Sequence, residues 1–236
     1  MGYTTSFSGR IAVEPPLSAE EISYLKAFAE SRRMERSQGP YHVEESRDGV
    51  VDSNTPPKGQ PGLWCQWIPV DDGSAIEWDG GEKFYCAPEW MAYIRTHFVA
   101  LCAARSAEPQ AMGFLEPHSM NGSVFSVGED TLGDVAKIEV DDQGVWISRG
   151  EWTAEAKADL FGIHGDDEEN REGDDWPDQD ETLSALAARP ELALFEPREL
   201  VPAFDSNDTV ALAFFEKTKL DEQLRAGSPQ SGRKTL

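Results

Sequence analysis

The start of the chain alternates between apolar and polar residues. From residue 3 to residue 13, the odd positions are mainly apolar and the even positions mainly polar. An extended strand with this period of two buries one face and exposes the other. The pattern therefore predicts a half-buried strand, which ends before Pro15 and Pro16 because proline has no N–H to donate to a sheet.

Two later segments repeat their apolar residues at the spacing of a helix. The first follows Ser18 and Glu21, which match a capping box, and leads into a basic cluster around Arg32 and Arg33. The second starts at Pro88, where a missing N–H costs little. Both segments are therefore predicted to be amphipathic helices. Their apolar faces comprise Ile22, Leu25 and Phe28 in the first helix, and Trp90, Ile94, His97 and Leu101 in the second.

Short apolar runs separated by turn residues predict the other strands. The turn Asp71-Asp72-Gly73 between two such runs is a hairpin signal. Hairpin-linked strands with separate helices indicate an α+β fold. We expect a mainly antiparallel sheet of about five to six strands, with both helices packed on one face because the strands have only one consistently apolar side. The further strands are expected at about residues 63–70, 74–79, 124–127, 135–140 and 145–148.

The composition changes after the last of these strands. Residues 165–181 hold ten acidic residues and a single arginine, and such a segment buries too little apolar surface to offset its chain entropy. We therefore expect an α+β domain over residues 1–150, a largely disordered acidic linker over 151–182, and a helical extension over 183–236 with a frayed tail. Helical patterns in this acidic C-terminal extension are expected at residues 183–188 and 208–224.

The net charge limits the partners that the protein can bind. The chain has 44 acidic and 21 basic residues, which gives a formal charge of −23. Binding to a phosphate backbone needs a basic face, so nucleic acid is a poor partner. We expect instead another protein with a basic surface. No metal site is expected, because the acidic run lacks the ligand order of an EF-hand loop.

The cysteines and the apolar runs bear on location. Cys65, Cys86 and Cys102 show no CxxC spacing and are odd in number, so we interpret them as free thiols in a reducing compartment. No run approaches the roughly 18 apolar residues of a membrane span. The N-terminus lacks the basic-then-apolar pattern of a secretory signal. We expect a cytoplasmic protein without membrane contact.

The candidate binding site lies in the tryptophan-rich segment of residues 56–85. Paired glycines allow positive φ and a close approach of a ligand to the backbone, although an ordinary glycine turn with exposed charges is the interpretation that we favour for this loop. Trp64 and Trp67 are three apart, so a strand directs one to the core and leaves the other available. The candidate residues are Trp64, Trp67, Trp78, Asp79, Gly80, Gly81, Glu82 and Lys83.

Catalytic chemistry has little support in the sequence. None of the short motifs of nucleophile elbows, zinc peptidases, P-loops or dinucleotide-binding turns is present. His118 lies in an expected loop and is free to titrate there. A pair with Cys86 stays open, because such pairs assemble in space rather than in sequence. We expect no catalytic residue and no cofactor.

Four short segments within residues 1–150 form a distinctive set: PPLS, GQPGLWCQWIP, IEWDGGEKFY and EWMAYI. Together with the opening strand and the later strand pair, they resemble a family of small uncharacterised proteins of bacteria and their phages. The resemblance implies one cytosolic domain in a mobile-element or host–phage setting. It implies no activity, cofactor or catalytic residue, and it does not extend beyond residue 150.

Two functions from different classes fit these observations. The first is a non-enzymatic, acidic protein-binding module that uses the region of residues 64–85, with immunity-type proteins and inhibitors in host–phage conflict as subclasses. The alternative is a small-molecule or nucleotide-derivative binding protein or enzyme that uses the loop from Trp78 to Lys83. It requires a concave pocket that gathers Asp79, Glu82 and Lys83, with His118 as a further member. A structural or accessory role without a tight partner is the third hypothesis.

Overall fold

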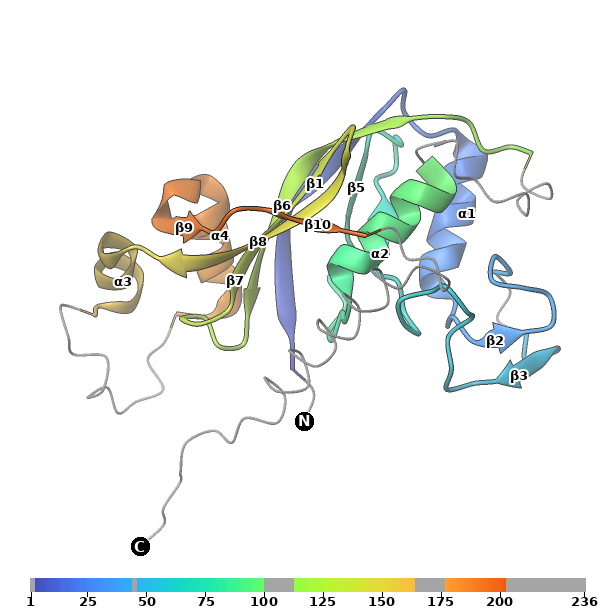
Figure 1. Cartoon of the computed structure of the whole chain (residues 1–236), viewed down its shortest axis with the longest axis horizontal. Helices are drawn as coiled ribbons and strands as arrows, with labels where there is room; N and C mark the ends of the chain where they lie inside the picture. Colours follow the sequence, from blue (N-terminus) through green and yellow to red (C-terminus); the bar gives the residue numbers. More distant parts are fainter. Residues whose placement is uncertain (1–2, 44–45, 100–112, 164–176, 203–236) are drawn as a thin grey trace, which may run out of the picture.

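An antiparallel sheet forms the centre of the molecule (Figure 1). The computed structural model describes residues 3–43, 46–99, 113–163 and 177–202. In this part of the chain, eight strands form one antiparallel sheet in the order β10-β8-β7-β6-β1-β5-β4, with β9 also paired to β8. Its strands are β1 (Thr5–Glu14), β4 (Trp67–Pro69), β5 (Ala75–Trp78), β6 (Ser119–Gly128), β7 (Val135–Asp141), β8 (Gly144–Trp152), β9 (Ala193–Phe195) and β10 (Glu199–Val201). A separate two-stranded sheet consists of β2 (Glu35–Arg36) and β3 (Val50–Asp52).

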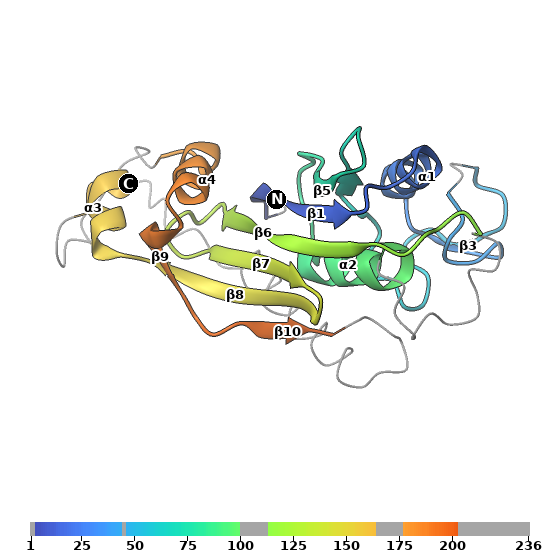
Figure 2. The same cartoon turned by 90° about the horizontal axis from the view of Figure 1, so that it is seen from above.

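Helices flank this sheet at both of its ends. The described α-helices are α1 (Ala19–Glu30), α2 (Ala87–Ile94), α3 (Ala154–Phe161) and α4 (Gln179–Ala188), with a π-helical turn at Arg95–Val99 and a 3₁₀ turn at Pro190–Leu192. Figures 1 and 2 place α3 and α4 at one end of the molecule, and α1 with the β2–β3 sheet at the other. The α+β fold and the mainly antiparallel sheet are confirmed. The expected five to six strands and two helices were too few.

The first helix begins at the predicted capping box. The hydroxyl of Ser18 accepts a hydrogen bond from the N–H of Glu21 at 3.3 Å, and the carboxylate of Glu21 accepts one from the N–H of Ser18 at 2.8 Å. These bonds satisfy two backbone donors that a helix start otherwise leaves open. On the buried side of α1, Leu25 and Phe28 pack into the core.

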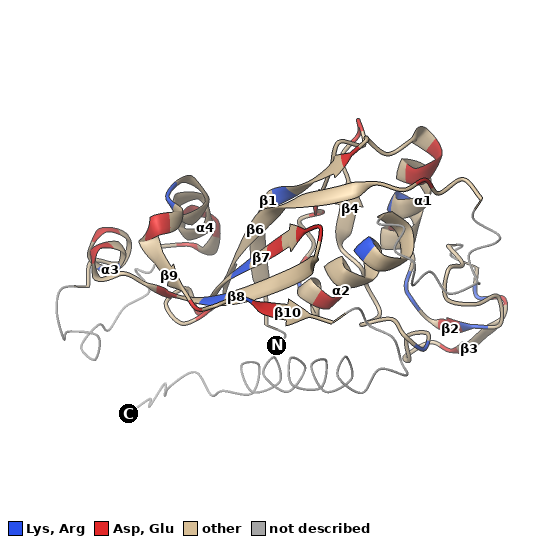
Figure 3. Ribbon diagram, turned by 45° about the horizontal axis from the view of Figure 1, so that its top comes forward, with Lys and Arg blue, Asp and Glu red and all other residues tan. Residues whose placement is uncertain are grey.

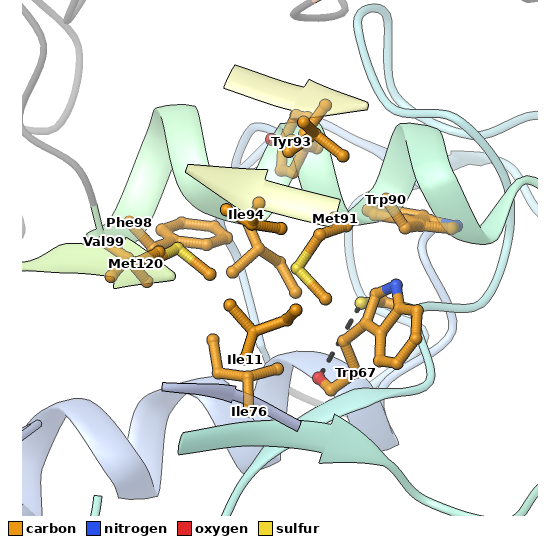
Figure 4. Close-up of a cluster of buried hydrophobic side chains, with 14 of the residues drawn as sticks. Ile11, Trp67, Ile76, Trp90, Met91, Tyr93, Ile94, Phe98, Val99 and Met120 are labelled. Carbon is orange, nitrogen blue, oxygen red and sulfur yellow. Dashed lines mark hydrogen bonds between the residues drawn. The ribbon is translucent and has the colours of Figure 1, made fainter. Parts of the chain in front are cut away.

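One face of the sheet carries the larger core. The buried odd-numbered residues of β1, among them Ile11 and Val13, lie in the same cluster as Phe28 of α1 and Trp90 and Ile94 of α2. Figure 4 shows Ile94 and Met91 of α2 directed toward Ile11 and Ile76 of the sheet. The period of two in β1 and the helical stripe in α2 therefore meet, as the sequence predicts.

The opposite face carries a second core, which the sequence analysis missed. Val124 belongs to the first cluster, whereas its neighbour Phe125 and also Val127 point to the other face, where they pack with Leu186 of α4 and Trp152 of β8. The central strand β6 is therefore buried on both sides. The sequence of β6 has apolar residues at both odd and even positions, which is the pattern of a strand buried on both faces. The sequence analysis missed this because it assumed one apolar face for the whole sheet.

The sheet continues beyond residue 150. That position, the expected end of the α+β domain, falls inside β8, and both β9 and β10 pair with β8. Within the segment expected as an acidic linker, α3 occupies Ala154–Phe161 and α4 begins at Gln179. Residues 164–176 and the helix expected at residues 208–224 lie outside the described residues.

Candidate functional site

The structure separates the three candidate tryptophans. Trp64 is 45% exposed, whereas Trp67 is 1% exposed. Trp64 lies before β4, so the alternation of a strand, on which the prediction rested, is not what separates them. Trp67 starts β4, and its Nε1–H donates to the carbonyl of Ala87 at 2.8 Å within the core shown in Figure 4. Trp78 lies opposite Trp67 in β5, is half-buried, and donates to Oε1 of Gln66 at 3.0 Å. Trp67 is thus a core residue, and Trp64 is the one of the three that is most available to a partner.

The glycine loop that follows β5 has the geometry of a turn. Gly80 has a φ of 82°, a conformation that favours glycine. The N–H of Gly81 donates to Oδ1 of Asp79 at 2.7 Å, so this carboxylate closes the turn. Glu82 and Lys83 are exposed, with their charged groups 4.0 Å apart. Neither of the two hollows described below is lined by Asp79, Glu82 or Lys83.

A hollow of about 550 Å³ lies beside Trp78 on the surface of β1 and β5. Gly9 in β1 has a φ of 122°, and a Cβ there would stand 2.5 Å from the carbonyl oxygen of Ser123 in β6. The charged residues of the hollow satisfy each other, because Nε of Arg10 lies 2.6 Å from Oε2 of Glu77. The lining residues are Phe7, Ser8, Gly9, Arg10, Glu77 and Trp78. This hollow therefore offers little unpaired charge to a ligand.

The candidate nucleophiles Cys65 and Cys86 are buried. Burial raises the pKa of the Cys65 thiol to about 12, and Cys86 is buried as well. His118 is buried rather than free in a loop: its Nε2 lies 2.9 Å from Oε1 of Glu21, and its Nδ1 lies 2.6 Å from a backbone carbonyl oxygen. The ring nitrogens of His118 are thus held by partners other than Cys86. Cys102 lies outside the described residues.

A larger groove, which the sequence analysis did not predict, lies at the end of the molecule that carries β2 and β3. It measures about 780 Å³ and is bordered by the end of α1, the strand pair and Trp64. Among its lining residues are Arg32, Met34, Arg36, Arg47, Val51 and Trp64. Of the eight candidate residues, Trp64 alone lines it. The basic cluster after the first helix was the available signal, but the residues from β3 and from the loop before it are too distant in sequence to be assigned to the same place.

Comparison of the chain with models of protein families, with curated proteins and with solved structures finds no match. The resemblance to bacterial and phage proteins therefore stays a prediction. Among the described residues, no group of three or more His, Cys, Asp or Glu side chains is placed to hold a metal ion. No helix in that same part of the chain combines the length and the apolar character needed to cross a membrane.

Proposed function

We propose that this protein is a non-enzymatic protein-binding module whose contact surface contains the exposed aromatic residues of the region 64–85. The observation that carries this proposal is that Trp64 and Tyr85 are 45% and 42% exposed, whereas Trp67 and Phe84 beside them are buried. Aromatic side chains give large contact areas at a low entropic cost and dominate the energy of protein interfaces. The buried rings of Trp67 and Phe84, which are close in sequence to the exposed ones, pack edge to face with their centroids 5.3 Å apart.

The partner carries a basic surface. The formal charge of −23 gives the molecule a negative field that speeds the approach of a basic protein and repels polyanions such as nucleic acid. Figure 3 shows acidic residues on α1, α3, α4, β7 and β10, so the negative charge is spread over the whole molecule. The field thus accelerates encounter from many directions, and the aromatic surface provides the specific contact.

Proteins that neutralise an enzyme with a basic active cleft are the subclass that fits this charge. Immunity-type proteins and inhibitors in host–phage conflict act in this way, and we propose them as subclasses by analogy. A reducing cytoplasm is the proposed location, which the buried thiols of Cys65 and Cys86 support because neither forms a disulfide.

A binding rather than a catalytic role is supported by the surroundings of the reactive side chains. The thiol of Cys65 is buried with a raised pKa, and His118 is held by Glu21, so neither is placed to attack a substrate. The alternative site at the glycine loop has weaker support, because the exposed side chains of Glu82 and Lys83 line neither hollow.

The proposal is tested by affinity capture from the lysate of the source cells at low and at high salt, read by mass spectrometry. We expect one protein in stoichiometric amount, with a recovery that falls at high salt. Replacing Trp64 or Tyr85 with alanine should abolish its recovery. The matched control is Leu194→Ala, which truncates a side chain that is 68% exposed in β9, at the other end of the molecule. Equal recovery by all variants, or no stoichiometric protein at either salt, would contradict the proposal.

A further inference from the structure

The groove beside Trp64 differs in charge from the rest of the molecule. Three arginines line it, Arg32, Arg36 and Arg47, and Glu30 is the acidic residue among its lining side chains. Figure 3 shows basic residues on β2 and on the segment that leads into it from α1, and acidic residues on β2 and β3, of which neither Glu35 nor Asp52 lines the groove. The chain as a whole has a formal charge of −23, so the overall composition does not explain why arginines outnumber acidic residues in this groove.

The arginines that follow α1 divide between the groove and the core. Residues 32–34 form a tight turn, in which the N–H of Met34 donates to the carbonyl oxygen of Arg32 at 2.9 Å, and β2 follows at Glu35–Arg36. Arg32, Met34 and Arg36 line the groove. Arg33 does not line it and is 2% exposed. The turn and the short strand thus bring two arginines and an apolar side chain to one wall.

Arg33 fixes this wall to the core. Its guanidinium donates to the carbonyl oxygens of Pro40 and His42, both at 2.7 Å, and to the hydroxyl of Ser31 at 2.8 Å. It also lies 4.0 Å from the ring centroid of Phe28. A guanidinium with several fixed acceptors holds its segment more rigidly than a lysine would. The groove is therefore preorganised, which lowers the entropic cost of binding.

Arg32 and Arg47 keep donors available at the groove. Arg32 donates Nε–H to the carbonyl of Ser53 at 3.1 Å, which orients its guanidinium and leaves its other N–H groups for a ligand, and Arg47 is exposed. Arg36 is 7% exposed and donates to the carbonyl of Ser46, so it contributes its charge to the wall of the groove more than free donors. Among the described residues, none of these three arginines forms an ion pair with a carboxylate, whereas arginines elsewhere do, such as Arg10 with Glu77 and Arg198 with Asp141.

An aromatic ring stands beside these positive groups. The guanidinium carbon of Arg32 lies 5.8 Å from the ring centroid of Trp64, and the indole is half exposed at the edge of the groove. Arginine groups pair with the oxygens of phosphates, and exposed indoles stack on nucleobases. The carboxylate of Glu30, at the same groove, is an acceptor of the kind that binds ribose hydroxyls in dinucleotide sites.

We propose that this groove binds a nucleoside diphosphate, with the phosphates on the arginines and the base against Trp64. The inference goes beyond the protein-binding function and does not depend on it. It also places the site away from the glycine loop after β5. A volume of about 780 Å³ is in the range of small-molecule sites, which is about 300 to 1,000 Å³.

The overall charge selects a small anion over a polymer. Exposed charges are screened beyond about 8 Å at physiological salt, so a ligand inside the groove is influenced mainly by its arginines. A nucleic acid would extend past the groove and meet the acidic residues on the rest of the surface. A nucleoside diphosphate has a base for Trp64 and phosphates for the arginines. It is also small enough to stay inside the groove.

The test is calorimetric titration of the full chain with each of the four ribonucleoside 5′-diphosphates in turn. Adenosine is the control ligand that has a base but no phosphates. Inorganic pyrophosphate is the control ligand that has phosphates but no base. The informative variant is Arg47→Glu, because Arg47 is exposed and forms no described hydrogen bond through its side chain. The matched control is Arg189→Glu, an exposed arginine after α4 at the far end of the molecule with the same change of charge.

We expect at least one diphosphate to bind more tightly than adenosine and pyrophosphate. The Arg47→Glu variant should weaken that binding by about tenfold or more, and Arg189→Glu should change it by less than about twofold. No binding by any of the four diphosphates would overturn the proposal, and so would equal losses in the two variants. Because Tyr85 does not line the groove, a Tyr85→Ala variant that loses the protein partner but keeps the diphosphate would separate the two functions.

Discussion

At the scale of single residues, the most informative contact is the buried pair of Glu21 and His118. Both ring nitrogens of His118 face acceptors, Oε1 of Glu21 at 2.9 Å and the carbonyl oxygen of Pro15 at 2.6 Å. A carboxylate only accepts hydrogen bonds, so the ring nitrogen that faces Glu21 is the donor of this contact. The pair ties the start of α1 to the segment that leads into β6.

Replacing Glu21 with glutamine should destabilise the protein by about 3 kcal/mol, because a buried carboxylate that accepts hydrogen bonds on both oxygens is replaced by an amide that can accept on only one. Oε1 of Glu21 also accepts from the N–H of Glu116 at 2.8 Å, and Oε2 accepts from the N–H of Ser18 at 2.8 Å, so several bonds are lost or weakened together. Urea denaturation measures the change. The control is Glu20→Gln on the exposed side of the same helical turn, which should change the stability by less than about 0.5 kcal/mol.

The same variant should reveal the pH dependence of this contact. Burial alone would raise the pKa of Glu21, but hydrogen bonds from Glu116, His118 and Ser18 outweigh it and lower the pKa below its usual 4.5. A lowered pKa in the folded state means stability that is present above the unfolded-state pKa and is lost as the pH falls through the folded-state value. The stability difference between the wild type and Glu21→Gln should therefore shrink as the pH falls below 4.5. A difference that stays constant down to unfolding would contradict this assignment.

Trp67 and Trp64 form a matched pair for a test of burial. Trp67→Ala removes a fully buried indole and its hydrogen bond to Ala87, so we expect a loss of about 3 to 5 kcal/mol. Trp64→Ala removes an exposed side chain and should cost less than about 1 kcal/mol. Thermal and urea unfolding report both values. Equal losses would show that the assignment of one indole to the core and one to the surface is wrong.

At the scale of elements, the small sheet of β2 and β3 depends on Arg33. Arg33→Lys keeps the charge but cannot reproduce the set of bonds to Ser31, Pro40 and His42. We expect this segment to open more often while the main sheet is unchanged. Amide hydrogen exchange should then accelerate by about tenfold at Glu35 of β2, whose N–H donates to the carbonyl oxygen of Thr55, just after β3, at 2.9 Å. The amides of β6 provide the internal reference, and equal acceleration there would contradict a local effect.

The elements that the sequence predicts are those with a local signal. The period of two in β1, the capping box of α1 and the turn between β4 and β5 each lie within about a dozen residues, and all three are present. The strands β9 and β10 have three residues each and exist through pairing with β8, some fifty residues earlier. Strands this short leave no usable periodicity, so they could not be predicted.

The candidate site was predictable to a similar extent. The spacing of Trp64 and Trp67 predicted that one would be exposed, and the glycine loop is the turn that its composition indicates. The groove was not predicted, because Arg47 and Val51 are far in sequence from Arg32. The fold of the intervening loop, to which Arg33 is bonded at Pro40 and His42, brings them to the same groove. Side-chain direction along residues 32–36 could not be predicted either, because it depends on the tight turn at residues 32–34.

At the scale of the whole molecule, one sheet has a hydrophobic core on each of its two faces. The first face packs against α1 and α2, and the second against α3 and α4, at opposite ends of the sheet. The arginine groove lies at the end with α1, where β2 and β3 border it. The acidic residues are distributed over both ends (Figure 3), so they act through the field of the entire molecule.

The central claim is that a protein partner contacts the aromatic surface, and site-specific photo-crosslinking in the source cells tests it most directly. A benzophenone amino acid would replace Tyr85, and in a second variant Leu194, since both side chains are exposed. We predict one cross-linked protein of defined mass from position 85 and none from position 194. No adduct at position 85, or the same adducts at both positions, would contradict the proposed binding surface.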